Sequence, residues 1–426
     1  MKAVISDRIY LTVTPDQQRK IDGELTYAIP SYRFDDPPIM IKNMALIRDG
    51  LIAIPSGRTD LIPVDHEIVD KRSIKSIKFP PFKLVLRPSQ QAVFNEVKDS
   101  SIINAWVSWG KTFTALAIAG KLGQKTLVVV HTLALRKQRE NEVKKVFGFT
   151  PDIIGSGKFS IETPLVVGNV QTLYRRIKNI RQEFGLIILD EMHHVSSMTF
   201  SRIIDKSCAR YKIGLTGTLL RKDGKHVVFR DYFGHNVLNP PKENFMVPKI
   251  DILKLPIRFM DGSSIPWANR VNELAYNPEY QNSIALTASA YAARGHKVLV
   301  VSDRVDFLRN CARLTGDDAV CVTGSVPHEE RPEIINQIFK DKNVLYGTQS
   351  IFSEGISLDI LSCLVLGTPV NNEPLLTQLI GRIIRNYEGK KQPTVVDIHL
   401  IGNTARRQAN ARLGHYIKEG YKVSTL

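Results

Sequence analysis

The tripeptide Gly110-Lys111-Thr112 has the residue types needed to bind the phosphates of a nucleotide. It follows an apolar, strand-like run and opens a helix-like run. In that setting backbone N–H groups point at a phosphate, the lysine reaches the β- and γ-phosphates, and the threonine hydroxyl can ligate Mg²⁺. Ala105 and Ser108 stand where glycines are usual, and the tripeptide alone is equally consistent with an ordinary helix start.

Two adjacent carboxylates, Asp190 and Glu191, supply a second chemical element directly after the apolar run Leu186–Leu189. A parallel strand buried on both faces delivers such residues to its carboxyl end, where ligands bind in open α/β sheets. There Asp190 can hold Mg²⁺ through water, and Glu191 can orient and deprotonate an attacking water. Together with the upstream lysine, this pair predicts a nucleoside triphosphatase. His193 and His194 lack zinc-site spacing, so no zinc is expected.

Further motifs surround these two elements in a fixed order. They are residues 86–90, 131–138, 168–172, 190–193, 214–221, 300–303, 347–357 and 378–385, the last with the pattern Gln-x-x-Gly-Arg-x-x-Arg. Together they resemble the motifs of the DExH-box helicases of superfamily 2. Within that superfamily, the compact size and the β-rich start of the chain look like phage-encoded branch-migration helicases and their XPB-like relatives.

The resemblance implies two RecA-like domains with ATP and Mg²⁺ between them, and it assigns a role to each matching residue. Thr112 and Asp190 are expected to hold Mg²⁺. The implied catalytic residues are Lys111, Asp190, Glu191, Gln378, Arg382 and Arg385, the two arginines acting as arginine fingers. The implied nucleotide contacts are Arg87, Gln90, Ser108, Trp109, Gly110, Lys111, Thr112, Gly355 and Ser357.

The resemblance also implies contacts with the backbone phosphates of a nucleic acid. These come from Thr132, Arg136, Asn169 and Thr348, although an ordinary surface residue or helix cap would explain each of them equally well. In addition, Thr216 and Thr218 are implied to couple ATP hydrolysis to movement along the nucleic acid. Thr216 ends an apolar strand-like run, and Thr218 follows it.

The chain departs from the family pattern in the loop before Gly110. Trp106 and Trp109 occupy positions that are usually small or polar, and they can either pack in the interior or stack on a base. Backbone N–H groups survive these changes, so the loop can still cradle phosphates. Ser357 replaces a common aspartate and would leave only a hydroxyl for a ribose contact.

The charge balance points to an anionic partner. The chain has 58 Lys and Arg residues against 42 acidic ones, a net charge of +16. Nucleic acid is the commonest partner for such a surplus, although anionic membranes and simple solubility also fit. Between residues 135 and 181 there are ten basic residues and four acidic ones, which predicts either a phosphate-binding stripe or a solvated helix face.

The elements that must position these residues alternate between strand-like and helix-like runs, which favours parallel sheets covered by helices. The expected fold is therefore α/β, with two tandem RecA-like domains at residues 85–240 and 241–426. A small β-rich accessory domain is expected at residues 1–84, with a hairpin at Asp49-Gly50 and DNA binding as its candidate role. A basic helix at residues 404–418 is expected to close the chain.

The prediction is an ATP-dependent DNA helicase or translocase that unwinds or branch-migrates forked and branched DNA. The alternatives are an RNA helicase of the same superfamily, or a DNA-binding protein whose ATPase is inactive. No apolar run reaches the roughly 20 residues of a membrane span, and the start of the chain lacks a secretory core. We therefore expect a cytoplasmic monomer, in the host cell if the chain is phage-encoded.

Overall fold

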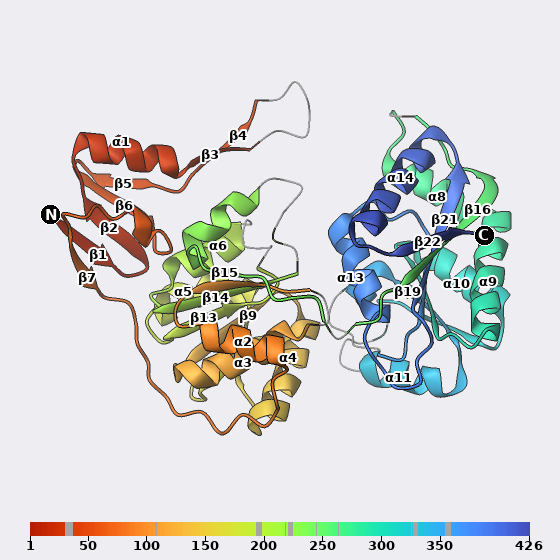
Figure 1. Ribbon diagram of the computed structural model, residues 1–426, viewed down its shortest axis with the longest axis horizontal. Coiled ribbons are helices and arrows are strands. Elements are labelled where there is room, and N and C mark those ends of the chain that lie inside the picture. The colour runs from red at the N-terminus through yellow and green to blue at the C-terminus, as the bar shows by residue number, and fades with distance from the viewer. Residues whose placement is uncertain are drawn as a thin grey trace. The chain divides into compact units, whose positions relative to one another are not determined.

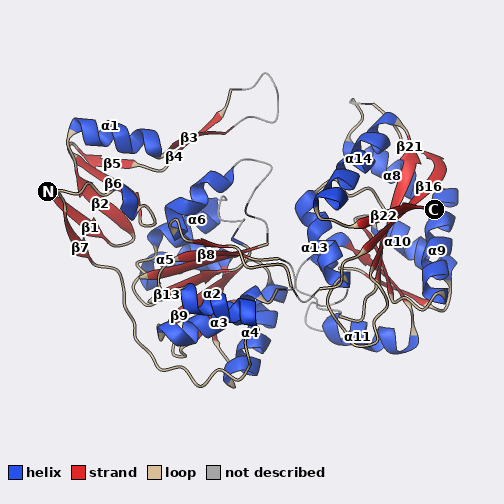
Figure 2. Cartoon of the chain, in the orientation of Figure 1, coloured by secondary structure: helices blue, strands red, loops and turns tan. Residues whose placement is uncertain are grey.

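The computed structural model describes residues 1–29, 37–106, 109–192, 198–217, 219, 225–243, 245–262, 264–324, 326, 331–353 and 359–426. These residues form two compact units, Met1–Lys242 and Glu243–Leu426. The first contains a small sheet and a large one, and the second is built on a single seven-stranded sheet (Figures 1 and 2).

A five-stranded sheet opens the first unit, with the strand order β5-β6-β2-β1-β7. The Asp49-Gly50 turn joins β5 to β6 as an antiparallel hairpin, as predicted, with Gly50 at φ +68°. A separate two-stranded ribbon pairs β3 with β4. The elements are β1 (Lys2–Ile5), β2 (Arg8–Thr12), α1 (Pro15–Glu24), β3 (Thr26–Ile29), β4 (Ile39–Lys42), β5 (Ala45–Arg48), β6 (Leu51–Pro55) and β7 (Glu67–Asp70).

The large sheet of the first unit has the order β11-β10-β12-β9-β13-β14-β8-β15, and its pairings are parallel except for β10 with β11. Its strands are β8 (Ser101–Asn104), β9 (Thr126–Val130), β10 (Asp152–Gly155), β11 (Lys158–Phe159), β12 (Leu165–Asn169), β13 (Leu186–Leu189), β14 (Tyr211–Thr216) and β15 (Val237–Leu238). Its helices are α2 (Pro88–Glu96), α3 (Lys111–Leu122), α4 (Leu133–Phe147), α5 (Val170–Ile180), α6 (Met198–Lys206) and α7 (Phe229–Phe233).

Helices cover both faces of this sheet, because alternate residues of a strand point to opposite sides. Val128 and Val130 of β9 pack in one core with α2, α3 and α4. Leu127 and Val129 pack in the other with α5, α6 and α7. Figure 1 shows α3 and α4 on one side of the sheet and α5 and α6 on the other. Because the central strands pair in parallel, their carboxyl ends lie at the same edge of the sheet.

The second unit is a parallel sheet with the order β18-β19-β17-β20-β21-β16-β22. Its strands are β16 (Lys249–Arg258), β17 (Val298–Ser302), β18 (Ala319–Val322), β19 (Val344–Thr348), β20 (Cys363–Leu366), β21 (Thr394–Ile401) and β22 (Lys422–Thr425). Its helices are α8 (Trp267–Tyr276), α9 (Pro278–Ala293), α10 (Val305–Thr315), α11 (Arg331–Asp341), α12 (Gln349–Ser353), α13 (Glu373–Ile383) and α14 (Asn403–Lys418).

The end of the chain differs from the prediction. Helix α14 is present, but it does not close the fold, because β22 follows it and pairs in parallel with β16. The 3.6-residue period of α14 is visible locally, whereas β22 is a short exposed-edge strand that depends on a partner distant in sequence. In the described part of the chain, no helix combines the length and apolar character needed to cross a membrane.

A buried ionic contact fastens the small sheet to the large one. Asp231 of α7 is fully buried, and Arg58 is 7% exposed. Arg58 Nη1 donates to Asp231 Oδ1 at 3.2 Å, and the hydroxyl of Tyr27 donates to the same oxygen at 2.9 Å. The backbone of Gly57 also runs against α7, because a Cβ there would lie 2.7 Å from the carbonyl oxygen of Arg230. The two sheets are therefore joined by specific contacts.

We expect Arg58→Met to lower the free energy of unfolding by roughly 3–5 kcal/mol, because it leaves the carboxylate of Asp231 buried without its cation. Urea unfolding followed by circular dichroism measures this loss. The control is Arg19→Met, which breaks an exposed Arg19–Asp16 pair and should cost below about 1 kcal/mol. Equal losses in the two variants would contradict the assigned role of Arg58.

Candidate functional site

The predicted phosphate loop leads into α3, which begins at Lys111 directly after Gly110. Gly110 has φ +91°, a left-handed conformation that favours glycine. The Nζ of Lys111 donates to the carbonyl oxygen of Ala105 at 3.1 Å, so the lysine side chain folds back over the loop. The helix N-terminus and this ammonium group together form the positive environment that a phosphate requires.

Arg87 and Gln90 form hydrogen bonds to the backbone at the end of this loop. The Oε1 of Gln90 accepts a hydrogen bond from the backbone N–H of Arg87 at 2.9 Å, and its Nε2 donates to the carbonyl oxygen of Trp109 at 2.8 Å. The guanidinium of Arg87 donates to the same carbonyl. Both residues are therefore adjacent to the phosphate loop, as their predicted role requires, and contact with a base stays a prediction.

Trp109 takes the packing alternative. Its side chain is fully buried in the core beside α3, and its indole N–H donates to the hydroxyl of Ser89 at 2.8 Å. The ring is thus part of the scaffold beneath the loop. Only its backbone remains for a phosphate contact.

We expect Gly110→Ala to lower the free energy of unfolding by more than the replacement of a left-handed glycine would by itself. The left-handed backbone costs an alanine about 1–2 kcal/mol. In addition, the new Cβ would lie 2.5 Å from Gln90 Nε2, and moving this amide costs its hydrogen bond to Trp109, about 1 kcal/mol. Gly157→Ala is the matched control, since Gly157 has φ +77° with no heavy atom within 4 Å of the Cβ position. Urea unfolding tests the difference, and equal losses would contradict the contact.

Asp190 and Glu191 follow β13 as predicted, and their environments separate their pKa values. Burial by itself raises the pKa of Asp190, but Arg139 and Lys111 outweigh it, so the pKa lies below its ordinary value. For Glu191, burial raises the pKa although Lys111 opposes it, and the charge of Asp190 adds to the rise. Divergent pKa values in adjacent carboxyls suit one anionic ligand and one proton acceptor.

The backbone at Glu191 is unusual, because φ is +50° in a residue other than glycine. Such conformations persist where the surroundings impose them, and they concentrate at functional sites. The Glu191 N–H donates to Asp190 Oδ1 at 3.1 Å, so the turn also orients its neighbour's carboxylate.

The residues present fit Mg²⁺ bound together with a nucleotide. Protein sites for Mg²⁺ bound with phosphates use one or two carboxylates and keep several waters. Asp190 provides a carboxylate, and Thr112 provides a hydroxyl at the start of α3. Among the described residues no cluster of three His, Cys, Asp or Glu side chains forms a metal cage of its own. This arrangement suits a metal that arrives with phosphate oxygens.

Thr216, the predicted coupling residue, ends β14 and is fully buried. Its carbonyl oxygen accepts a hydrogen bond from the N–H of Ala105 at 3.0 Å, which places it beside the phosphate loop. The remaining predictions in this group, namely Ser108, Thr218, Gly355 and Ser357, lie outside the described residues, as do His193 and His194.

Arg136 and Asn169, two of the predicted nucleic-acid contacts, lie together at the carboxyl ends of β9 and β12. Arg136 Nη1 donates to Asn169 Oδ1 at 3.3 Å and to the hydroxyl of Ser156 at 2.8 Å. Thr132 caps α4 by accepting from the N–H of Leu135 at 3.1 Å, which is the helix-cap alternative. The three predicted residues of this unit thus share one edge, and their contact with a strand remains a prediction.

The positive charge between residues 135 and 181 does not form a single stripe. Lys144 and Lys145 lie on α4, whereas Arg175, Arg176 and Lys178 lie on α5, and these helices pack on opposite faces of the sheet. The reason is the path of the chain, because β10, β11 and β12 lie between the two helices, and α5 packs on the face opposite to α4. Of the two alternatives, a single continuous stripe is therefore not what the structure shows for these residues.

In the second unit, Gln378 and Arg382 lie one turn apart on α13, and Arg385 follows the helix. Arg382 Nε donates to the carbonyl oxygen of Phe352 at 2.9 Å, and Arg385 Nη1 pairs with Asp359 Oδ1 at 3.1 Å. Thr348 ends β19 and is 9% exposed. The catalytic roles of the two arginines stay predictions.

Sequence reasoning missed Arg139. This residue of α4 is 7% exposed and forms an ion pair with Asp190. The sequence shows it only as one of many basic residues on α4. Its place one turn beyond Arg136 on the helix was a usable signal, but the pairing with a carboxylate 51 positions away depends on the sheet order.

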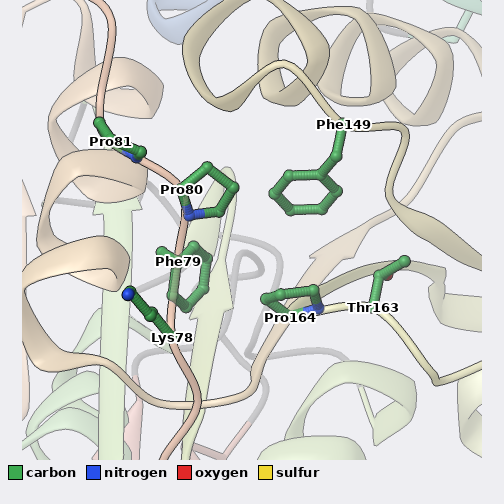
Figure 3. Close-up of a pocket in the computed structure, with 7 residues that line it drawn as sticks. All are labelled: Lys78, Phe79, Pro80, Pro81, Phe149, Thr163 and Pro164. Carbon is green, nitrogen blue, oxygen red and sulfur yellow. The ribbon is translucent and has the colours of Figure 1, made fainter.

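An apolar pocket lies apart from these residues. Figure 3 shows Phe79, Pro80, Phe149 and Pro164 surrounding it, with Lys78, Pro81 and Thr163 completing the lining. None of its lining residues is among the predicted site residues. The pocket therefore adds nothing to the chemistry at α3 and β13.

Two family models match the chain. The model described as the res subunit of type III restriction enzymes matches residues 83–221, and the helicase conserved C-terminal domain matches residues 282–387. The chain is 40% identical to the probable helicase D10 of Escherichia phage T5, over 100% of this chain and 96% of that protein.

More distant relatives are similar over most of the chain. Identity is 26% to the putative ATP-dependent RNA helicase L396 of Acanthamoeba polyphaga mimivirus, covering 79% of this chain and 69% of that one. It is 25% to the DNA 3'-5' translocase XPB2 of Sulfurisphaera tokodaii, covering 81% and 88%. A fragment of a putative HsdR subunit of a type I restriction enzyme from Vibrio vulnificus matches 81% of this chain and 69% of its own, with a TM-score of 0.58 and 19% identity. This last likeness bears on the fold alone, which is α/β with tandem parallel sheets as predicted.

Proposed function

Because this chain belongs to the superfamily 2 helicases, we propose that it unwinds or branch-migrates forked and branched DNA. As an ATP-dependent helicase of this superfamily it is an ATP hydrolase. The observation that supports ATP hydrolysis, on which the proposal depends, is the grouping of Lys111 with Asp190 and Glu191, where the charge of Lys111 acts on both carboxyls.

In the proposed mechanism the first domain binds the phosphates and prepares the water. Gly110 and Lys111 hold the phosphates at the N-terminus of α3. Glu191 accepts a proton from the attacking water, because its raised pKa makes it a better base than an ordinary carboxylate. Thr112 and Asp190 would hold Mg²⁺, which supplies charge neutralisation on the phosphate oxygens when bound.

Residues of the second domain complete the proposed mechanism. Arg382 and Arg385 stabilise the charge that develops on the transferred phosphoryl group, with Gln378 beside it. Gly355 and Ser357 are proposed to contact the nucleotide. Cycles of ATP binding and hydrolysis then close and open the two RecA-like domains, and that movement drives translocation.

We further propose that Thr132, Arg136, Asn169 and Thr348 contact backbone phosphates. Such contacts carry no base information, so the substrate is recognised by its form. The relatives support DNA through the name of the XPB2 translocase. The mimivirus relative, named as an RNA helicase, supports the RNA alternative.

Phosphate release measured with forked DNA, single-stranded DNA and RNA at one salt concentration separates these alternatives, because affinity depends on salt. We expect the greatest stimulation by forked DNA, together with ATP-dependent opening of a four-way junction. Stronger stimulation by RNA would replace the proposal by the RNA helicase. DNA binding without stimulated phosphate release would favour the inactive ATPase.

The division into domains at residues 1–84, 85–240 and 241–426 also remains our proposal, as does the monomeric state at low DNA occupancy. Light scattering of the full chain without DNA tests the latter. A dimer mass would contradict it.

A further inference from the structure

Arg139 holds the carboxylate of Asp190 from one side. Its Nε donates to Asp190 Oδ2 at 2.8 Å, and its Nη2 donates to the same oxygen. Asp190 Oδ1 accepts from the backbone N–H of Glu191. Both partners of the ion pair are more than nine-tenths buried. The carboxylate is therefore fixed in orientation through one oxygen while the other faces the Glu191 turn.

On the side away from Asp190, the guanidinium of Arg139 pairs with a second carboxylate, that of Glu142. Its Nη1 donates to Glu142 Oε2 at 2.5 Å, and Gln138 Nε2 donates to Glu142 Oε1 at 3.0 Å. The row Asp190–Arg139–Glu142 thus carries one positive and two negative charges. Glu142 therefore offsets part of the positive charge that Arg139 places beside Asp190.

The same helix carries the proposed contacts to nucleic acid. Arg136 lies one turn before Arg139 on α4, and it hydrogen-bonds to Ser156 and Asn169. Because both arginines lie on α4, a shift of this helix when Arg136 contacts a phosphate would also displace Arg139. Buried ion pairs contribute little to stability on average, so stability alone gives weak reason for this arrangement.

We propose that Arg139 is a positioning residue: it sets the orientation of Asp190 for the Mg²⁺–nucleotide, and it makes that orientation respond to nucleic acid bound at Arg136 and Asn169. The second half of this inference rests on the proposed function. Groups that orient a metal-ligating carboxylate typically change metal affinity or activity by about 10–100-fold when removed.

The test is the Mg²⁺ dependence of binding a fluorescent ATP analogue to the full chain. For Arg139→Met we expect the half-saturating Mg²⁺ concentration to rise by about 10–100-fold. Binding of the analogue in EDTA should change little. Arg139→Lys, which keeps the charge with fewer hydrogen bonds, should restore part of the affinity.

Arg412→Met is the matched control, because Arg412 forms a buried pair with Asp397 of the same kind, at 3.0 Å and 2.7 Å. It should lower the unfolding temperature without moving the Mg²⁺ curve. Equal shifts in the Arg139 and Arg412 variants would overturn the positioning role. If Arg139→Met fails to fold, Arg139→Lys decides, since an unchanged Mg²⁺ curve in that variant would overturn the role as well.

The coupling is tested by the ratio of DNA-stimulated to unstimulated phosphate release. We expect this ratio to fall in Arg139→Lys at saturating Mg²⁺, and an unchanged ratio would overturn the coupling. The Mg²⁺ titration needs no turnover. Failure of the wild-type chain to hydrolyse ATP would therefore count against the proposed function, whereas an unshifted Mg²⁺ curve counts against Arg139.

Discussion

Arg385→Ala is expected to reduce kcat for DNA-stimulated ATP hydrolysis by about 10³-fold or more, since an arginine finger contributes roughly 10³–10⁵ in kcat. The Arg385–Asp359 pair leaves the side chains 26% and 47% exposed. An exposed pair is worth about 1 kcal/mol at most, so loss of the contact with Asp359 costs little. Phosphate release at saturating ATP and DNA measures the effect.

The matched control is Arg407→Ala, which removes an exposed arginine of α14 and should leave kcat within a few-fold of wild type. Binding of a fluorescent ATP analogue should persist in the Arg385 variant, because the proposed role concerns the transition state. A wild-type kcat in Arg385→Ala would remove the residue from the mechanism.

Glu191→Gln is expected to lower kcat by about 10²–10⁴-fold, the usual contribution of a general base. Nucleotide binding should be retained, because glutamine has almost the same size and Lys111 keeps its position on the loop. The raised pKa of Glu191 also has a consequence for the unsubstituted protein. The rate should fall on acidification at a pH above the ordinary glutamate range, because the base is lost when it is protonated.

Glu162→Gln serves as the control, since Glu162 is an exposed carboxylate remote in sequence from β13. Single-turnover phosphate release in both variants separates chemistry from product release. Undiminished release by Glu191→Gln would exclude Glu191 as the base. Absence of release even in wild type would favour the DNA-binding alternative.

Much of the fold could be predicted because its central strands are continuous apolar runs. The apolar run Leu186–Leu189 forms β13 with the same bounds, and its burial on both faces of a parallel sheet explains why. The hairpin at Asp49-Gly50 could also be predicted, because the Asp-Gly turn is a signal contained in neighbouring residues. The apolar run over residues 101–107 predicts a longer strand than β8, which ends at Asn104 because the phosphate loop begins within that run.

The candidate site was predictable to a similar degree. The motif order identified Lys111, Asp190 and Glu191, and the structure brings their charges together. For Trp109 the sequence allowed two alternatives, packing in the interior or stacking on a base, and these differ only in whether the ring faces the core or a ligand. Local sequence does not contain that information.

What the sequence alone determined is therefore the set of chemical groups and the strands that carry them, because residue type and local periodicity act over a few neighbours. The tertiary structure decided which groups meet. It paired Arg139 with Asp190, placed the basic residues of α4 and α5 on opposite faces, and joined β22 to β16. These outcomes depend on strand order and crossovers, which bring together segments whose separation along the chain gives no indication of contact.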